Sequence, residues 1–580
     1  MKKTSPKKTN SLKKRLKRLS QEQAETSKNR IRRKFIDRLP HIRQVRLLVV
    51  EWAMIVIAII MLSITQSFRY TESYATSSWD EGGTYIEGSI GAINSLNPLF
   101  ANTASEQTLS RLMFSTLTTV DYSGHVGLDL AKSIQSNETG DSWTVWLRDN
   151  LKWSDGEPIT NADVLYTIKT IKSPDSNNIY ASNLSGVEVS EDDSGALIFN
   201  LPASYASFAS ALNIPILPEH ILRDVPADLL LENNFSSSPV TSGPFKYNAT
   251  QSGENADEKT VYLTENTNYY KDLPLLDGFI VHAYSDKGRL LSALNSGEIM
   301  GTASLLPTDD GEVTNPQINK KLTSISSGVF AFLNNDSHIF SNKSLRKAIQ
   351  QGLDMRSLRA PLGDEIGLDY PLLESQISIN NYPALPEYDP DAARSTISSW
   401  TEKSEIPETV KLVTVNTGYL PALGENLKYQ LEQLGFTVNL SVVEPTQDFL
   451  ITTLRPRDYD ILLFEIELGS DPDLFAYYHS SQASGSGLNL SNYKNTLASD
   501  LLLAARSTVD QGVRATKYES FLKYWVDDAP AIAIYQVNMA YFVNQNVKSF
   551  SEDSRLVTPT DRFTDVLHWS TVKSVKNRTP

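Results

Sequence analysis

The chain has 580 residues, 40% hydrophobic and 21% charged, a composition typical of a globular protein with several domains. It contains no cysteine, which excludes disulfides, thiolate metal sites, cysteine nucleophiles and lipid attachment through an N-terminal cysteine. The net charge of -14 is unevenly distributed, because residues 1–46 carry 17 Lys and Arg against three acidic residues and the remainder carries -28.

The chain begins with this basic arm and continues into the apolar run Leu47–Ile64, in which Glu51 is the only charge. A helix over this run would extend about 27 Å, close to the roughly 30 Å hydrocarbon core of a bilayer. We expect a cytoplasmic tail at 1–46, a transmembrane signal anchor at 47–68 and a linker at 69–82. The alternatives are a buried core helix, which usually has a polar stripe, and a cleaved signal peptide, which has a shorter basic region.

The stretch WLRDNLKWSDGEPITNADV, from Trp146 to Val164, is predicted to be scaffold. Just before and within it, the alternation of Trp143, Val145 and Leu147 with their neighbours indicates a strand. Asp155-Gly156 favours a tight turn, and Thr160 and Asn161 are good N-caps for the helix that follows. Strand, turn and capped helix account for these residues without a ligand.

The C-terminal half alternates strands with helices, which predicts an α/β lobe with a largely parallel sheet. In the helices, apolar residues recur on one face, as do Leu427, Leu431 and Leu434. The expected strands are 408–416, 436–444, 459–467 and one that begins at Ala531, and the expected helices are 425–435, 446–454 and 518–525.

No motif of catalysis or metal binding is present in the sequence. The seven histidines include no pair at helical ligand spacing and no H-E-x-x-H pattern. The G-x-S-x-G elbow of hydrolases and the glycine patterns of nucleotide-binding proteins are also missing. We therefore expect a binding protein with no catalytic residue, metal or cofactor.

Candidate ligand-binding residues gather after the strand 459–467, because ligands of open α/β sheets bind outside the carboxyl ends of the strands. Carboxylates there can pair with an ammonium group, and tyrosines add flat apolar contacts with a hydrogen-bonding tip. The candidates are Glu465, Glu467, Asp471, Asp473, Tyr477, Tyr478 and Tyr493. Asp471 and Asp473 are also suited to capping the helix that follows, and the two roles are compatible.

Six segments in order resemble the family 5 extracellular solute-binding proteins of ABC transporters, the group of the dipeptide-, oligopeptide- and nickel-binding proteins. The resemblance extends over most of the chain after the linker. The segments are GSIGAINSLNPLF (88–100), residues 128–168, SPVTSGPFKYN (238–248), FAFLNNDSHIFSNKSLRKAIQQGLD (330–354), SDPDLFAYYHSS with LNLSNYKN (470–495), and DDAPAIAIYQ (527–536).

The resemblance implies an α/β, type II periplasmic-binding fold, in which two hinged lobes linked by crossing strands close over a ligand. It further implies a monomer that captures a solute and delivers it to ABC permease subunits, without chemistry on the solute. The implied domains are lobe I at 83–125, 215–310 and 530–575, an extra domain at 126–214, and lobe II at 311–529.

The resemblance also implies a ligand site, with one departure. Peptide-binding members hold the peptide amino terminus with an aspartate, and this chain has Leu468 at about that position. Either Glu467 or Asp471 takes over this role, or the ligand has no free amine. For a peptide ligand, the cleft would be lined by Glu467, Asp471, Asn489, Tyr493, Tyr419 and the backbone near Gly91.

Two other functions stay open at this point. The same fold could bind a non-peptide solute such as a glycan or a metal chelate, or the anchor could display a surface hydrolase or adhesin. Nucleic acid is not expected as a partner, because the acidic body would repel its phosphates.

Overall fold

The computed structural model describes residues 46–577 except 122, 177, 179, 182–183, 254, 256–257, 361–365, 403–408 and 484–486. The chain divides into two units, one formed by residues 79–573 and the other by the segments up to 78 and from 574. The predicted cytoplasmic tail lies outside the described residues, except for its last residue.

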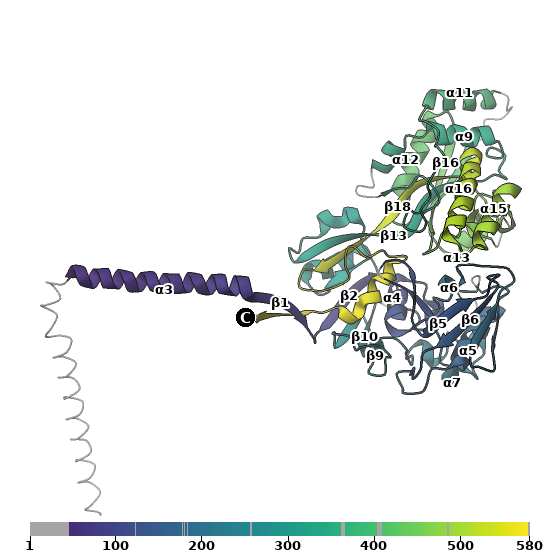
Figure 1. The fold of residues 1–580 in the computed structure, drawn as a ribbon. Coiled ribbons are helices and arrows are strands. Elements are labelled where there is room, and N and C mark those ends of the chain that lie inside the picture. The colour runs from purple at the N-terminus through teal and green to yellow at the C-terminus, as the bar shows by residue number, and fades with distance from the viewer. Residues whose placement is uncertain are drawn as a thin grey trace, which may run out of the picture. The chain divides into compact units, whose positions relative to one another are not determined.

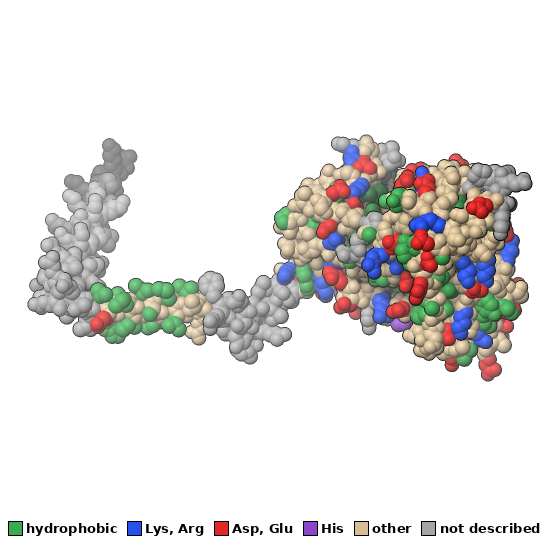
Figure 2. Space-filling model, turned by 90° about the horizontal axis from the view of Figure 1, so that it is seen from above, with side chains coloured by type: hydrophobic (Ala, Val, Ile, Leu, Met, Phe, Trp, Pro, Cys, Tyr) green, Lys and Arg blue, Asp and Glu red, His purple; other side chains and the backbone are tan. Residues whose placement is uncertain are grey.

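The first unit contains helix α3 (Arg46–Tyr74). Large apolar side chains between Val50 and Ile64 are exposed along it, and Figure 2 shows them as hydrophobic surface. Among the described residues, no helix is both long enough and apolar enough to cross a membrane, so the anchor predicted at 47–68 is not confirmed. Around the predicted linker, α3 ends and strand β1 (Ala75–Asp80) pairs with β19 (Val572–Asn577).

The unit 79–573 is built around one mixed sheet, which has 11 strands in the described part of the chain. The strand order is β16-β15-β17-β13-β18-β12-β2-β11-β10-β9, and β14 pairs with β18. Their bounds are β2 Thr84–Ile90, β9 Phe245–Ser252, β10 Lys259–Glu265, β11 Gly278–Tyr284, β12 Gly301–Thr302, β13 Ile318–Leu333, β14 Ile366–Gly367, β15 Thr409–Val415, β16 Thr437–Val443, β17 Ile461–Glu467 and β18 Ala531–Asn544.

The two longest strands of this sheet, β13 and β18, run antiparallel beside each other and join its two ends (Figure 1). Their pairing is interrupted between Ser324 and Gly328, where the register shifts. Such an irregularity bends a strand and increases its local twist. The register shift therefore favours a bend in the sheet at residues 325–327.

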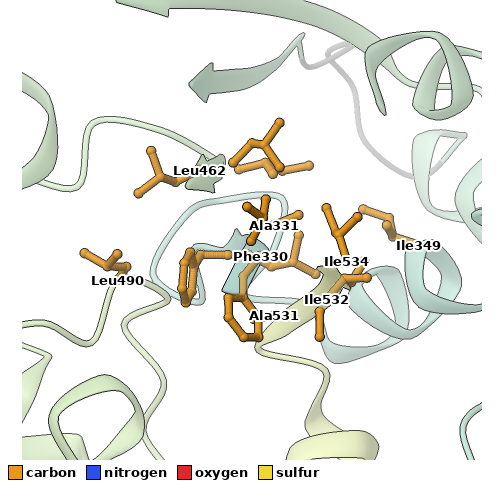
Figure 3. Close-up of a cluster of buried hydrophobic side chains, with 14 of the residues drawn as sticks. Phe330, Ala331, Ile349, Leu462, Leu490, Ala531, Ile532 and Ile534 are labelled. Carbon is orange, nitrogen blue, oxygen red and sulfur yellow. The ribbon is translucent and has the colours of Figure 1, made fainter. Parts of the chain in front are cut away.

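Buried apolar side chains form two large clusters on either side of this interruption. Cluster A is drawn mainly from residues 85–281 and 539–569, and cluster B from residues 329–535. Figure 3 shows part of cluster B, in which Phe330 of β13, Leu462 of β17 and Ile532 of β18 pack together.

A second sheet, of order β5-β6-β8-β7, forms much of the predicted extra domain. The buried residues of this domain belong to cluster A. The predicted strand, turn and helix around Trp146 are confirmed: β6 is followed by a turn at Gly156 and by α5. The N-cap is Thr160, whose backbone N–H donates to Asp163 at 2.7 Å, and Asn161 is the first helical residue. The bounds are β5 Ala131–Ser136, β6 Ser142–Leu147, β7 Glu188–Glu191, β8 Leu197–Asn200 and α5 Asn161–Lys172, with β3 Thr118–Val120 paired to β4 Val126–Leu128.

The predicted alternation in the C-terminal half is confirmed, while the sheet is only partly parallel. β15 is parallel to β16 and β17, but β17 is antiparallel to β13. Because β16 lies at the edge of the sheet, its Val442 is 43% exposed.

The three predicted helices are present in this unit, but α12 begins five residues before the predicted start at 425, and α16 begins seven residues before 518 and ends three residues after 525. They are α4 Ala104–Met113, α6 Phe208–Ala211, α7 Glu219–Leu222, α8 Lys287–Ser296, α9 Lys343–Gly352, α10 Met355–Arg359, α11 Pro390–Thr401, α12 Leu420–Gln433, α13 Gln447–Phe449 with a π-helix at Leu450–Leu454, α14 Phe475–Tyr478, α15 Thr496–Arg506, α16 Gln511–Asp528 and the 3-10 helix η10 Pro559–His568.

A buried ion pair joins segments from both ends of this unit inside cluster A. Glu87 of β2 is fully buried and accepts a hydrogen bond from Arg562 of η10 at 2.7 Å. The hydroxyls of Tyr85 and Tyr541 donate to the same carboxylate at 2.9 and 2.7 Å. β2, β18 and η10 are thus held together by one fully bonded carboxylate.

Replacing Glu87 with Ala should lower the free energy of unfolding by about 3 to 5 kcal/mol, because it leaves the buried Arg562 charge without a partner. Urea unfolding followed by tryptophan fluorescence measures this. Glu138→Ala, at an exposed turn, is the control, and an equal unfolding midpoint for both variants would contradict the assignment.

Candidate ligand-binding site

A cavity of about 710 Å³ lies where the two clusters meet, and its walls come from both. The interruption of β13 forms part of it, through Ile325 and Ser327. The described lining residues are Ala101, Gln107, Ser110, Arg111, Phe114, Thr116, Tyr180, Ser210, Asn213, Pro215, Ile325, Ser327, Val415, Thr417, Leu420, Pro445, Phe464, Glu465, Glu467, Val557, Thr558, Pro559, Thr560 and Asp561.

Two carboxylates of β17 reach this cavity. Glu465 and Glu467 are two residues apart on the strand, so their side chains share a face. Because β15 and β17 are parallel, their carboxyl ends meet at the same edge of the sheet, and residues at the carboxyl ends of both strands line the cavity. The sequence analysis predicted the ligand-binding residues at this edge of the sheet.

The pKa of Glu467, one of the carboxylates of the cavity, is raised by its surroundings. The side chain of Glu467 is exposed to the water of the cavity, but protein atoms surround it on most sides. This desolvation, together with the nearby Asp561 and Glu465, raises its pKa to about 7. Burial also raises the pKa of Glu465, against a hydrogen bond with Ser327 that lowers it. At neutral pH the site therefore favours a cation that would compensate these charges.

Arg111 lines the same cavity from helix α4, on the side of cluster A. Its Nη2 donates to the hydroxyls of Thr119 and Thr564, at 2.6 and 3.0 Å. Helix α4 is itself fixed by a capping box, in which Thr103 and Glu106 bond each other's backbone N–H groups. The guanidinium is thus positioned by cluster A, while Glu465 and Glu467 are positioned by cluster B.

Outside the described cavity lining, a stack of side chains joins a segment packed against cluster A to helix α15 of cluster B. The guanidinium of Arg506, at the end of α15, lies 4.2 Å from the ring centre of Tyr205 and 4.6 Å from that of Phe475. The ring of His479 stacks on Phe475 at 4.0 Å. The backbone N–H of Ala206 donates to the carbonyl of Arg506 at 2.9 Å, so a main-chain hydrogen bond connects the same two segments as the side chains do.

Asp471 and Asp473, in the loop after β17, have partners within the protein. Asp471 forms a two-pronged ion pair with Arg514, one contact of which is 2.9 Å. Asp473 accepts the backbone N–H of Phe475 and lies 3.4 Å from Arg506. The charge of Asp471, a predicted ligand for an amine, is therefore already compensated.

Asn489 and Tyr493 lie in the core rather than on the cavity wall. Asn489 is fully buried, and its side-chain amide donates to the carbonyls of His479 and Tyr493. The Tyr493 hydroxyl donates to Asp528 at 2.7 Å. In this structure both residues hold a loop in place.

Tyr419 and Gly91 are near strand ends, as predicted, but do not belong to the described lining. Tyr419 precedes α12 and packs against cluster B, between Thr417 and Leu420, which do line the cavity. Gly91 follows β2, and its N–H donates to Tyr284 at 3.2 Å. Its φ of +121° favours glycine for conformational reasons alone.

Leu468, which the resemblance places at about the position of an aspartate in peptide-binding members, has a structural role here. Leu468 is 6% exposed and packs in cluster B. Its N–H donates to the carbonyl of Ser326 at 2.7 Å, which ties the end of β17 to the interruption of β13. Of the predicted candidates, Glu465 and Glu467 thus line the cavity in the described part of the chain.

Sequence reasoning missed Arg111, Asp561 and Ser327. They lie far apart in the chain, and each belongs to an element whose other residues are explained by packing or capping. Ser327 sits at the interrupted register of β13, which no local pattern signals. Within the described residues, no group of three or more His, Cys, Asp or Glu side chains is arranged to hold a metal ion.

Comparison with known proteins gives one family and a consistent fold. The model of the bacterial extracellular solute-binding proteins, family 5 Middle, matches residues 125–487. The oligopeptide-binding protein AppA of Bacillus subtilis is 26% identical over 531 residues, which cover 86% of this chain and 95% of that protein.

Two solved structures with ligands have the same fold. AppA from Bacillus subtilis in complex with a nonapeptide covers 85% of this chain and 100% of its own, with a TM-score of 0.70 and 24% identity. NikZ from Campylobacter jejuni in complex with Ni(L-His) covers 84% of this chain and 99% of its own, with a TM-score of 0.69 and 22% identity.

Replacing Asp561 with Asn should lower the pKa of Glu467, because it removes a negative charge that faces this carboxylate. A ¹³C NMR titration of protein labelled at the glutamate carboxyl carbons measures this, with Glu467→Gln to assign the signal. Asp565→Asn in the same helix, outside the cavity lining, is the control. A Glu467 pKa that is unchanged by Asp561→Asn would contradict the proposed coupling.

Proposed function

Because this chain belongs to the bacterial extracellular solute-binding proteins of family 5, we propose that it captures peptides in the cavity between clusters A and B and delivers them to an ABC importer. Proteins of this family are binding components of transport systems, so the chain is a binding protein and not an enzyme. Its binding part belongs outside the cytoplasm, where the solute is. The permease subunits and a monomeric state are parts of the proposal.

The observation that carries the peptide assignment is the environment of Glu467. It is a carboxylate at the carboxyl end of a sheet strand, without a basic partner at ion-pair distance in the described chain, beside Glu465 and opposite Asp561. An ammonium group placed among them would relieve their mutual repulsion and replace lost hydration. A peptide amino terminus supplies such a group.

The two halves of the unit are also suited to closing over a ligand. We propose that clusters A and B are the cores of two lobes and that the interruption of β13 at 325–327 is the hinge. Ligand contacts from both sides would then favour the closed arrangement.

A chelated metal is the second candidate ligand, because the similarly folded NikZ was solved with Ni(L-His). In such a chelate an amino acid provides the metal ligands, so few are needed from the protein. Native mass spectrometry of the protein purified from its own cells distinguishes a bound peptide from a bound metal complex by mass.

Replacing Glu467 with Gln should weaken binding of peptides with a free amino terminus by about 10- to 100-fold, because an ionic hydrogen bond is lost. Binding of N-acetylated peptides should be weak in both proteins. Isothermal titration calorimetry measures the affinities, and Glu432→Gln on an exposed face is the control. Equal affinity of the parent and Glu467→Gln for free-amine peptides would refute this role.

The same carboxylate predicts the pH dependence of binding. The pKa of Glu467 in the free protein is raised to about 7, and a bound ammonium group would lower it, so binding releases a proton below that pH. Affinity should therefore rise from about pH 5.5 to about pH 7.5 in the parent. Glu467→Gln should remove most of this rise, and a parent protein with flat affinity over this range would contradict the assignment.

We further propose that the apolar surface of α3, preceded by the basic arm, holds the protein at the membrane. The tether would keep the binding part beside its permease at high local concentration. The full chain should sediment with membranes and resist extraction by carbonate, whereas a chain that begins at Trp79 should stay in the supernatant. Carbonate-soluble full chain would exclude the anchor.

A further inference from the structure

The strand β6, at the start of the scaffold stretch described above, carries a tryptophan that does not belong to the core. Trp143 and Val145 of this strand are buried in cluster A, and Leu147 packs against the same cluster. Because neighbouring residues of a strand point to opposite faces, Trp146 lies on the outer face of the second sheet, where it is partly exposed. Folding therefore leaves a large aromatic side chain facing the solvent.

Trp146 lines a cavity of about 630 Å³, which shares no described lining residue with the cavity between clusters A and B. The described walls come from β5, β6, the start of α5 and the turn between β7 and β8. The residue opposite Trp146 on β5 is Ser133, which is too small to cover an indole. Within the described chain, no other ring stacks on this indole and no acceptor bonds its Nε1, whereas Trp143 packs on Phe208 and donates to the carbonyl of Gly140.

The described wall of this cavity has no net charge. Its charged side chains are Lys132 and Asp149, which pair with each other at 3.0 Å, and the other described lining residues are neutral. The cavity between clusters A and B differs, because Glu465 and Glu467 lie close together there. The cavity at Trp146 therefore favours a neutral ligand over an ion.

Neutral hydrogen-bonding groups surround the indole. The hydroxyl of Ser133 and the amide of Gln135 line the cavity without a side-chain partner among the described residues. The Nδ2 of Asn161 donates to Glu191 and to the carbonyl of Gly195, at 3.0 and 2.9 Å. These bonds fix the amide of Asn161 and leave its Oδ1 as an acceptor for which the described chain supplies no donor.

We propose that this cavity binds a neutral saccharide, with one sugar ring packed on the indole of Trp146. A pyranose ring has an apolar face of C–H groups, which packs on an aromatic ring, and hydroxyls around its rim that both donate and accept hydrogen bonds. Trp146 complements the first feature, and Gln135 and Asn161 complement the second. A purely apolar ligand would leave the amides unbonded. The site is separate from the proposed peptide capture and would allow the binding part to contact a glycan outside the cytoplasm.

The test uses a panel of neutral tetrasaccharides, each built from glucose, galactose, mannose or N-acetylglucosamine. Saturation-transfer NMR with the full chain identifies the sugars that bind, and titration gives their affinities. The variants are Trp146→Ala and Trp146→Tyr, with Tyr429→Ala as the control. Tyr429 is a 61% exposed aromatic residue on α12.

The parent and Tyr429→Ala should bind the same tetrasaccharide with equal affinity. Trp146→Ala should weaken this binding by about 10-fold or more, because an aromatic anchor is lost, and Trp146→Tyr should retain part of it. The melting temperature and peptide binding should stay unchanged, since Trp146 lies outside both the core and the other cavity. Added salt should have little effect, because the charges of the wall are matched.

The inference fails if the folded parent binds none of the tetrasaccharides. It also fails if Trp146→Ala binds them as tightly as the parent, or if a peptide displaces the sugar, because the sugar then lies elsewhere. An affinity that falls steeply with salt would show that charged groups make the contact. Peptide capture is judged separately, by the Glu467→Gln experiment.

Discussion

The antiparallel pairing of β13 with β18 is the constraint on which the rest of the unit depends. These strands are long enough to contribute to both hydrophobic clusters, and they bring residues near 325 and 540 beside each other. Because their register breaks at 325–327, the sheet is continuous but not uniform. The cavity lies at this break, so the same irregularity that bends the sheet also supplies Ile325 and Ser327 to the wall.

Buried carboxylates such as Glu87 have basic partners, whereas a carboxylate of the described cavity wall does not. In cluster A the carboxylate of Glu87 has an arginine and two tyrosine hydroxyls, and Asp471 outside the cavity has Arg514. Glu467, by contrast, lines the cavity without an ion-pair partner among the described residues. Since unmatched charge in a partly dehydrated place costs free energy, it is expected where a ligand supplies the missing partner.

Local pattern predicted much of the fold but little of the site. Hydrophobic periodicity and N-cap residues predicted the strand, turn and helix around Trp146 and the alternation of strands and helices after residue 408. These features depend on residues that are neighbours in sequence. Asp471, Asn489 and Tyr493 have the residue types of a ligand site, but their partners Arg514, His479 and Asp528 come from other segments and use those groups internally. Arg111 and Asp561 carry no local signal, since 450 residues separate them and only the fold brings them to one wall.

The stack of Arg506 between Tyr205 and Phe475 has a consequence for kinetics. Its members come from both sides of the cavity but are not part of the described lining. If the two sides separate as proposed, the cation–π contacts and the Ala206 hydrogen bond break, whatever ligand is enclosed. These contacts would thus add to the barrier for the proposed opening and hence to the residence time of the ligand. Two proteins with the same cavity but different residues in this stack would then share a specificity and differ in how fast they release the ligand.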